Sequence, residues 1–189
     1  MTLKTFIAAA LATTTLTGAA LAESHAGTDN PMVGGAAMFP DKNIVENAVN
    51  SADHTTLVAA VKAADLVDTL MGEGPFTVFA PTNAAFDRIS DESLNALLQP
   101  SAKAQLAQIL TCHVVAANAM SDAIAGMIAD DGGMHPVQTV GGCTLQAKMD
   151  GSKITLTDEN GRDATVTIAD VRQSNGVIHV IDRVLLPAQ

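Results

Sequence analysis

Two short stretches constrain the fold of this chain more than any other feature. They are Gly74–Phe86, with the sequence GPFTVFAPTNAAF, and Asn175–Pro187, with the sequence NGVIHVIDRVLLP. Each combines a strand pattern with a turn or helix signal, and most of the chain's length lies between or before them. Neither contains an obvious catalytic group. Both patterns therefore indicate residues that hold a fold together rather than a reaction centre.

The first stretch predicts a strand followed by a helix. Phe76, Val78 and Phe79 are aromatic or β-branched residues, which suit a pleated and half-buried surface. Pro81 ends the strand, because proline has no backbone donor. Thr82 or Asn83 can then cap a helix that begins near residue 84, with its side-chain oxygen accepting a hydrogen bond from a free amide.

The second stretch predicts a turn followed by a central strand. Asn175 and Gly176 form the turn, since both residue types tolerate positive φ. Residues 177–186 are nearly all apolar, which is typical of a strand covered on both faces. The residues expected to maintain the fold in both stretches are Phe76, Val78, Phe79, Pro81, Thr82, Phe86, Asn175, Gly176, Val177, Ile178, Val180 and Leu186.

Hydrophobic spacing over the remaining chain predicts helices first and strands later. Helical periodicity covers residues 44–49, 57–64, 66–70, 90–98, 100–110 and 121–129. A short strand is expected at 112–115, and alternating patterns at 145–149, 154–156 and 164–168 predict an antiparallel meander with one buried face. This order indicates a single α+β domain.

The two stretches resemble the two signature motifs of the fasciclin domain family, in residue type and in order. The resemblance covers residues 43–187, nearly all of the chain after its N-terminal segment. It implies a fasciclin-like β-sandwich or wedge with an N-terminal helical layer. It also implies a secreted or cell-surface module that binds a protein or an extracellular-matrix component, as in cell adhesion, and that needs no cofactor and catalyses no reaction.

The N-terminus is typical of a signal peptide. Lys4 gives a positive start, an apolar run follows, and Ala20-Leu21-Ala22 fits a cleavage site. A membrane-spanning helix is the alternative, but threonines and a glycine interrupt the run and it is short for a span. We expect a removed signal peptide at 1–22, a flexible leader at 23–40 and a fasciclin-like domain at 41–189. The protein is then secreted or periplasmic, without a membrane anchor.

The formal net charge of −10 argues against nucleic acid and against anionic lipid surfaces as partners. Solubility alone is a sufficient explanation for this charge. The sequence contains no G-x-S-x-G, H-E-x-x-H, P-loop or G-x-G-x-x-G motif, so it nominates no catalytic residue. The oligomeric state does not follow from the sequence.

Cys112 and Cys143 are the two cysteines of the chain, and an oxidising compartment favours their pairing in a disulfide. Such a bridge would close a loop of about thirty residues and contribute roughly 3–4 kcal/mol in the chain-entropy model. Two buried free thiols, or a metal pair formed with His113, are the alternatives. No CxxC spacing supports a metal.

His113 is the one binding residue that the resemblance suggests. Cys112-His113 stands where the family often has a Tyr-His pair that is implicated in binding, and the histidine matches while the cysteine does not. The alternative is a histidine whose ring bonds a backbone group and holds a loop. His179 is expected to be a core residue, and Asp182 with Arg183 to be solvated charges or part of a structural ion pair.

A metal site at the mature N-terminus is predicted from chemistry rather than from resemblance. Cleavage after Ala22 would leave Glu23-Ser24-His25, in which the free amine, two amides and the imidazole can form a square-planar site for Cu(II) or Ni(II). Met32 and Met38 could add soft ligands for Cu(I). Such a site would make the protein a periplasmic metal or small-ligand carrier, which is the alternative to an adhesion module. The other interpretation is an accidental histidine in a flexible leader.

Overall fold

The computed structural model describes residues 30–188 and confirms the α+β class. The helices are α1 (Ile44–Ala48), α2 (Thr55–Ala63), α3 (Val67–Met71), α4 (Asn83–Phe86), α5 (Asp91–Leu97), α6 (Lys103–Thr111) and α7 (Ser121–Asp130). The strands are β1 (Met32–Val33), β2 (Ala36–Ala37), β3 (Phe76–Pro81), β4 (Val114–Val115), β5 (Met134–Gln138), β6 (Thr144–Asp150), β7 (Lys153–Thr157), β8 (Asp163–Gln173) and β9 (Gly176–Ile181). Strands β1 and β2 form a hairpin, and the others form one seven-stranded sheet in the order β4-β3-β9-β8-β7-β6-β5.

Strands β3 and β9 carry the two sequence motifs and lie side by side in the sheet. They pair in parallel, with Phe76 opposite Gly176 and Pro81 opposite Ile181. A Cβ atom at position 176 would collide with the carbonyl of Phe76, so the close approach of the two strands requires glycine there. The motifs therefore meet across one strand pair, despite their separation in the sequence.

Alternate residues of β3 and β9 enter two different hydrophobic cores. Val78 and Ala80 of β3, with Ile178 and Val180 of β9, belong to the core beneath helices α1–α6. Phe79 and Ile181 belong to the second core, which includes Ile124 and Ile128 of α7 and the buried faces of β6–β8. A strand that serves two cores must be largely apolar on both faces, which is what the nearly all-apolar run of β9 predicted.

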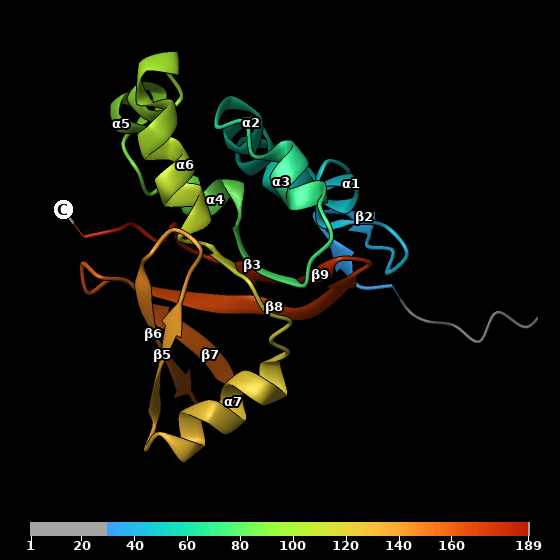
Figure 1. Ribbon diagram of the computed structural model, residues 1–189, viewed down its shortest axis with the longest axis vertical. Coiled ribbons are helices and arrows are strands. Elements are labelled where there is room, and N and C mark those ends of the chain that lie inside the picture. Colours follow the sequence, from blue (N-terminus) through green and yellow to red (C-terminus); the bar gives the residue numbers. More distant parts are fainter. Residues whose placement is uncertain (1–29, 189) are drawn as a thin grey trace, which may run out of the picture.

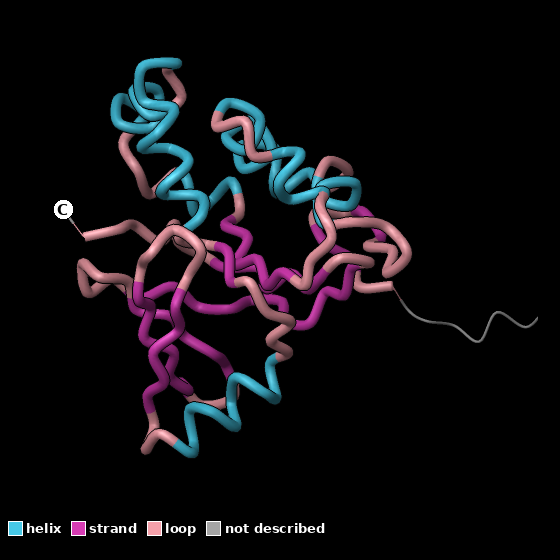
Figure 2. The backbone as a smooth tube through the Cα atoms, viewed as in Figure 1, coloured by secondary structure: helices cyan, strands magenta, loops and turns pink. Residues whose placement is uncertain are grey.

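The sheet changes direction along β8, and this bend separates the two cores. Pairing of β8 with β9 shifts register between Val166 and Ile168 and again between Ile168 and Val171. Figure 1 shows β3, β8 and β9 running across the molecule, with β5, β6 and β7 descending steeply from them. Figure 2 shows the helices, drawn in cyan, above the first group of strands and α7 below, beside the second group.

Four features differ from the sequence prediction. Strand β9 ends at Ile181 rather than near residue 186, and Cys112 caps α6 rather than opening a strand. Strand β5 was not predicted, because its proline and alternating exposed positions give a weak apolar pattern. Within the segment expected to be a leader, residues 32–37 form the β1–β2 hairpin, which was not predicted. Met38 docks in the core, as its apolar side chain allows, whereas Phe39 is 40% exposed.

Substitution of Phe79 tests the role of the central strand. Phe79 is 1% exposed, so we expect Phe79→Ala to lower the free energy of unfolding, by about 3–5 kcal/mol as for other large core truncations. Urea denaturation measures the change. Phe39→Ala is the matched control, because the Phe39 side chain is 40% exposed. Equal losses in the two variants would contradict the assignment of Phe79 to the core.

Candidate functional site

The turn before β9 is fixed by the side chain of Asn175. Its Oδ1 accepts a hydrogen bond from the Ile44 amide at 3.0 Å, at the start of α1. Its Nδ2 donates to the carbonyls of Leu70 at 2.8 Å and Gly72 at 3.0 Å, at the end of α3. One amide side chain thereby satisfies free backbone groups at the ends of two helices, which makes this corner of the molecule rigid.

A groove lies against this fixed turn. It has a volume of about 550 Å³, and the end of α3, the loop before β3 and the β8–β9 turn form its walls. Its polar groups come from residues such as Asn43, Glu73, Asn118 and Ser174, whereas Met71 adds a large apolar side chain that is 46% exposed. The groove is the candidate binding surface of the described chain.

Polar residues of the first motif fix helices in the same way. Thr82 caps α4 by accepting a hydrogen bond from the Ala85 amide. Asn83 Oδ1 accepts from the Thr56 amide at 3.0 Å, and Asn83 Nδ2 donates to the Ala52 carbonyl at 2.9 Å. The first motif therefore holds the start of α2 against the end of β3.

A disulfide joins Cys112 to Cys143, with 5.4 Å between their Cα atoms. Cys112 ends α6 and Cys143 precedes β6, so the bridge connects the helical layer to the meander. Both cysteines are buried. With both sulfur atoms in the disulfide, neither cysteine has a thiolate with which to bind a metal beside His113.

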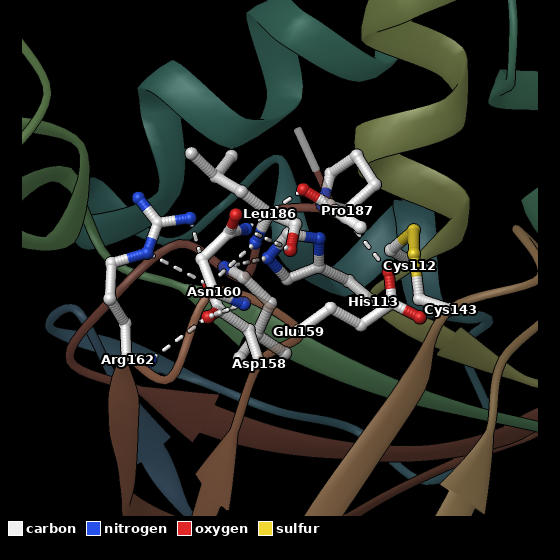
Figure 3. A network of polar contacts seen from close by, with 11 residues as sticks. Cys112, His113, Cys143, Asp158, Glu159, Asn160, Arg162, Leu186 and Pro187 are labelled. Carbon is white, nitrogen blue, oxygen red and sulfur yellow. Dashed lines mark hydrogen bonds and ion pairs between the residues drawn. A yellow bond between two sulfur atoms is a disulfide. The ribbon is translucent and has the colours of Figure 1, made fainter.

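The neighbouring His113 is 2% exposed, and both nitrogens of its ring have backbone partners (Figure 3). Its Nδ1–H donates to the Ile109 carbonyl at 2.8 Å, and its Nε2 accepts from the Leu185 amide at 2.9 Å. Burial lowers the pKa of His113 from 6.5 to about 4, and the hydrogen bond to Ile109 offsets this only in part. The ring is neutral at pH 7 and does not reach the surface. It holds the segment after β9.

The loop between β7 and β8 holds the same C-terminal segment from the other side (Figure 3). Asp158 is buried, accepts from the Leu186 amide at 3.1 Å and pairs with Arg162 at 2.9 Å. Asn160 Nδ2 donates to the carbonyls of Leu186 and Pro187, at 3.1 and 2.8 Å. Side chains thus replace the sheet partners that this segment lacks. Sequence reasoning missed Asp158, although the turn signal of residues 158–161 marks its loop.

Two further histidines are buried and serve the scaffold. His179 Nε2–H donates to the Ala119 carbonyl at 2.8 Å, its Nδ1 accepts from the Asp170 amide at 3.2 Å, and the ring stacks on Phe79. His54 Nδ1 lies 2.8 Å from Ser51 Oγ. Desolvation by burial lowers the pKa of both histidines. The prediction that His179 is a core residue is confirmed.

Asp170 and Asp182 are structural carboxylates. Asp170 accepts from the amide of Ser121 at 2.7 Å and from its hydroxyl, so it caps α7, whose own N-cap residue Met120 cannot. Asp182 accepts from the Thr165 amide at 2.8 Å and lies 3.9 Å from Arg88. The partner of Asp182 is the partly exposed Arg88, in the segment after α4.

The proposed N-terminal metal ligands Glu23, Ser24 and His25 lie outside the described residues. Of the two methionines suggested as further ligands, Met32 is 59% exposed, whereas Met38 is 2% exposed and packs in the core. Only Met32 is therefore accessible to a surface metal. Across residues 30–188, no cluster of three or more His, Cys, Asp or Glu side chains could hold a metal ion.

Comparison with known proteins gives consistent matches. The family model described as "Fasciclin domain" matches residues 52–187. The chain is 42% identical to Protein sll1483 of Synechocystis over 168 residues, which cover 89% of this chain and 86% of that protein. It is 33% identical to Immunogenic protein MPB70 of Mycobacterium bovis over 149 residues, which cover 74% of this chain and 66% of that protein.

Animal relatives and a solved structure extend these matches. Identity to the pig transforming growth factor-beta-induced protein ig-h3 is 35% over 133 residues, which cover 70% of this chain but 17% of that protein. The structure of a FAS1 domain pair from the insect cell adhesion molecule Fasciclin I superposes with a TM-score of 0.69 at 18% identity, covering 78% of this chain and 51% of that one. The fold is therefore the FAS1 fold. No helix among the described residues is long and apolar enough to cross a membrane.

The buried imidazole of His113 predicts how stability depends on pH. Its pKa is about 4 in the folded protein against an ordinary value of 6.5, so between these values the unfolded chain binds more protons. The neutral His113 ring therefore contributes fully to the free energy of unfolding above pH 6.5, and this contribution is lost as the pH falls to 4. The total loss is roughly 3 kcal/mol. His54 and His179 add to the loss in the same direction. Urea denaturation across this range measures it.

The variant His113→Gln isolates the contribution of this ring. Gln does not titrate, so the variant should be less stable at neutral pH and should lose less stability on acidification. A wild-type protein equally stable at pH 4 and 7, or a variant whose pH profile is as steep as that of the wild type, would contradict the prediction.

The N-terminal metal site makes a separate prediction. Protein whose N-terminus is verified as Glu23 should bind one Cu(II) with the visible absorption of a square-planar nitrogen site. His25→Ala should abolish this absorption, and His135→Ala is the control within the domain. Equal Cu(II) binding by His25→Ala would contradict the site.

Proposed function

The chain belongs to the fasciclin domain family, and from this premise we propose that it is an exported binding module that recognises a protein or matrix component at the cell exterior and catalyses no reaction. The proposed organisation is a signal peptide at 1–22, a leader at 23–40 and a binding domain at 41–189, with the hairpin and Met38 of the leader packed on the domain. Cell adhesion is named for one structural relative, the insect molecule Fasciclin I. Adhesion between two surfaces would need a second binding face or a second copy of this single domain.

The observation that supports binding rather than catalysis is the way four interior polar side chains are used. His113 and His179, which could act as general bases, engage both ring nitrogens with backbone groups, and their lowered pKa values follow from burial. Asp158 and Asp170 likewise accept hydrogen bonds from backbone amides. These groups hold loops and helix ends in fixed positions, and fixed loops form a preorganised recognition surface.

The groove beside Asn175 is the surface that best fits this role. Its walls are immobilised by the hydrogen bonds of Asn175 to α1 and α3, so a partner would order little of the chain on binding. Met71 supplies exposed apolar area next to several amide and hydroxyl side chains. An apolar centre with polar groups around it is the usual anatomy of a protein interface.

Saturable binding to the native cell envelope or to matrix components tests the proposal. Labelled protein should bind these preparations, and unlabelled protein should compete. Met71→Lys should weaken binding by at least about tenfold, the effect typical of a central interface residue. Met149→Lys is the matched control, because Met149 is 39% exposed on β6 and does not line the groove.

The outcomes separate the parts of the proposal. Equal binding of both methionine variants would show that the partner contacts a surface other than the groove. Absence of saturable binding, or turnover in a screen of esterase and glycosidase substrates, would overturn the proposed function itself.

A further inference from the structure

A cavity of about 70 Å³ lies between the helical layer and the sheet. Helices α1, α2, α3 and α6 and strands β3, β4 and β9 all contribute to its walls. Its inner lining is apolar: Phe76 and Phe79 contribute to it, and the aliphatic members include Leu57, Val61, Leu70, Val78, Leu110 and Ile178. The cavity is separate from the groove beside Asn175, which lies beyond the end of α3.

The walls of the cavity offer no free hydrogen-bonding group in the interior. His113 reaches the lining, but its nitrogens bond the backbone of Ile109 and Leu185. Thr111 also lines it, and its hydroxyl donates to the Ala107 carbonyl at 2.7 Å. Water needs two to four polar partners to occupy a buried site, so the space favours an apolar occupant.

The cavity reaches the surface beside lining residues that are exposed. Lys62 and Thr69 mark this boundary on α2 and α3, and Val140 marks it beyond β5. Lys62 is the one charged side chain among the lining residues, and it takes part in none of the ion pairs between described residues. Its aliphatic stem can follow the apolar wall while its ammonium group stays in water.

We propose that this cavity binds the chain end of an amphiphile whose anionic head pairs with Lys62, and that a medium-chain carboxylate is the simplest ligand of this class. The apolar walls favour a hydrocarbon chain, and the unpaired ammonium group of Lys62 favours a negatively charged head group. The acidic protein as a whole does not oppose this, because charges beyond about 8 Å are screened at physiological ionic strength. The proposal is independent of the binding function assigned to the groove.

The volume limits how much of the chain is buried. The cavity of about 70 Å³ is smaller than the apolar cavity of about 150 Å³ that holds benzene in another protein. It therefore takes the end of a chain rather than a whole large molecule. Binding should strengthen by about fourfold for each buried methylene and then level off when the space is full.

Calorimetric titration of the full mature protein with hexanoate, octanoate, decanoate and dodecanoate tests the proposal. We expect saturable binding with one site, a steep gain over the shorter chains and a plateau for the longer ones. Decyltrimethylammonium should bind more weakly than decanoate. Absence of saturable binding, or a gain that continues without a plateau as in adsorption to a surface, would overturn the proposal.

Two pairs of variants locate the site. Val58→Phe fills the cavity from α2 and should weaken decanoate binding at least tenfold, whereas Val137→Phe, at a half-buried position on β5, should not. Lys62→Glu should weaken decanoate and strengthen decyltrimethylammonium, whereas Lys153→Glu, at an exposed position on β7, should change neither. If Val58→Phe does not fold, the comparison of Lys62→Glu with Lys153→Glu tests the proposal. Decanoate binding that Lys62→Glu leaves unchanged would overturn the proposal.

Discussion

Strands β3 and β9 can pair because Gly176 lets the backbone of Phe76 approach closely, and every other layer is built upon this pair. The two strands send alternate side chains into opposite cores, so they are buried on both faces along nearly their whole length. Helices α1–α6 cover one face and α7 the other. A defect in the pairing would therefore expose both cores together, which explains why both motifs are dominated by apolar and turn-forming residues.

Buried polar side chains satisfy backbone groups that the sheet pairing leaves free. Where β9 ends, the chain has no sheet partner, and His113 and Asp158 supply acceptors for the amides of Leu185 and Leu186. Where β8 bends, Asp170 has a positive φ of 60°, and its carboxylate caps the start of α7. An unpaired buried amide costs roughly 1–3 kcal/mol, so these contacts matter through the penalty they avoid. They also bury the imidazole of His113, which is 2% exposed.

The sequence predicts the parts of this fold that depend on local pattern. The apolar run of β9 indicates a two-faced strand, and alternation in β6 and β8 indicates one buried face, because periodicity depends on side-chain type alone. It does not predict β5, whose residue Pro136 and exposed positions resemble a loop. Nor does it show that Asp158 meets Leu186, or that His113 meets Leu185, since both contacts depend on how distant segments pack. The groove beside Asn175 is likewise assembled from segments that are remote in the sequence.

The cavity beneath the helices follows from the same composition that builds the cores. The chain has no Trp and no Tyr, and 3% of its residues are aromatic, so mostly aliphatic side chains, with a few phenylalanines, fill the space where several helices meet the sheet. Helices α1 and α3 have five residues each and cover this region only in short segments. The ten-residue α7, fixed at its start by Asp170, covers the other core with one continuous apolar face. A gap is therefore expected on the helical side, and its dry walls make it a site for an apolar chain rather than for water.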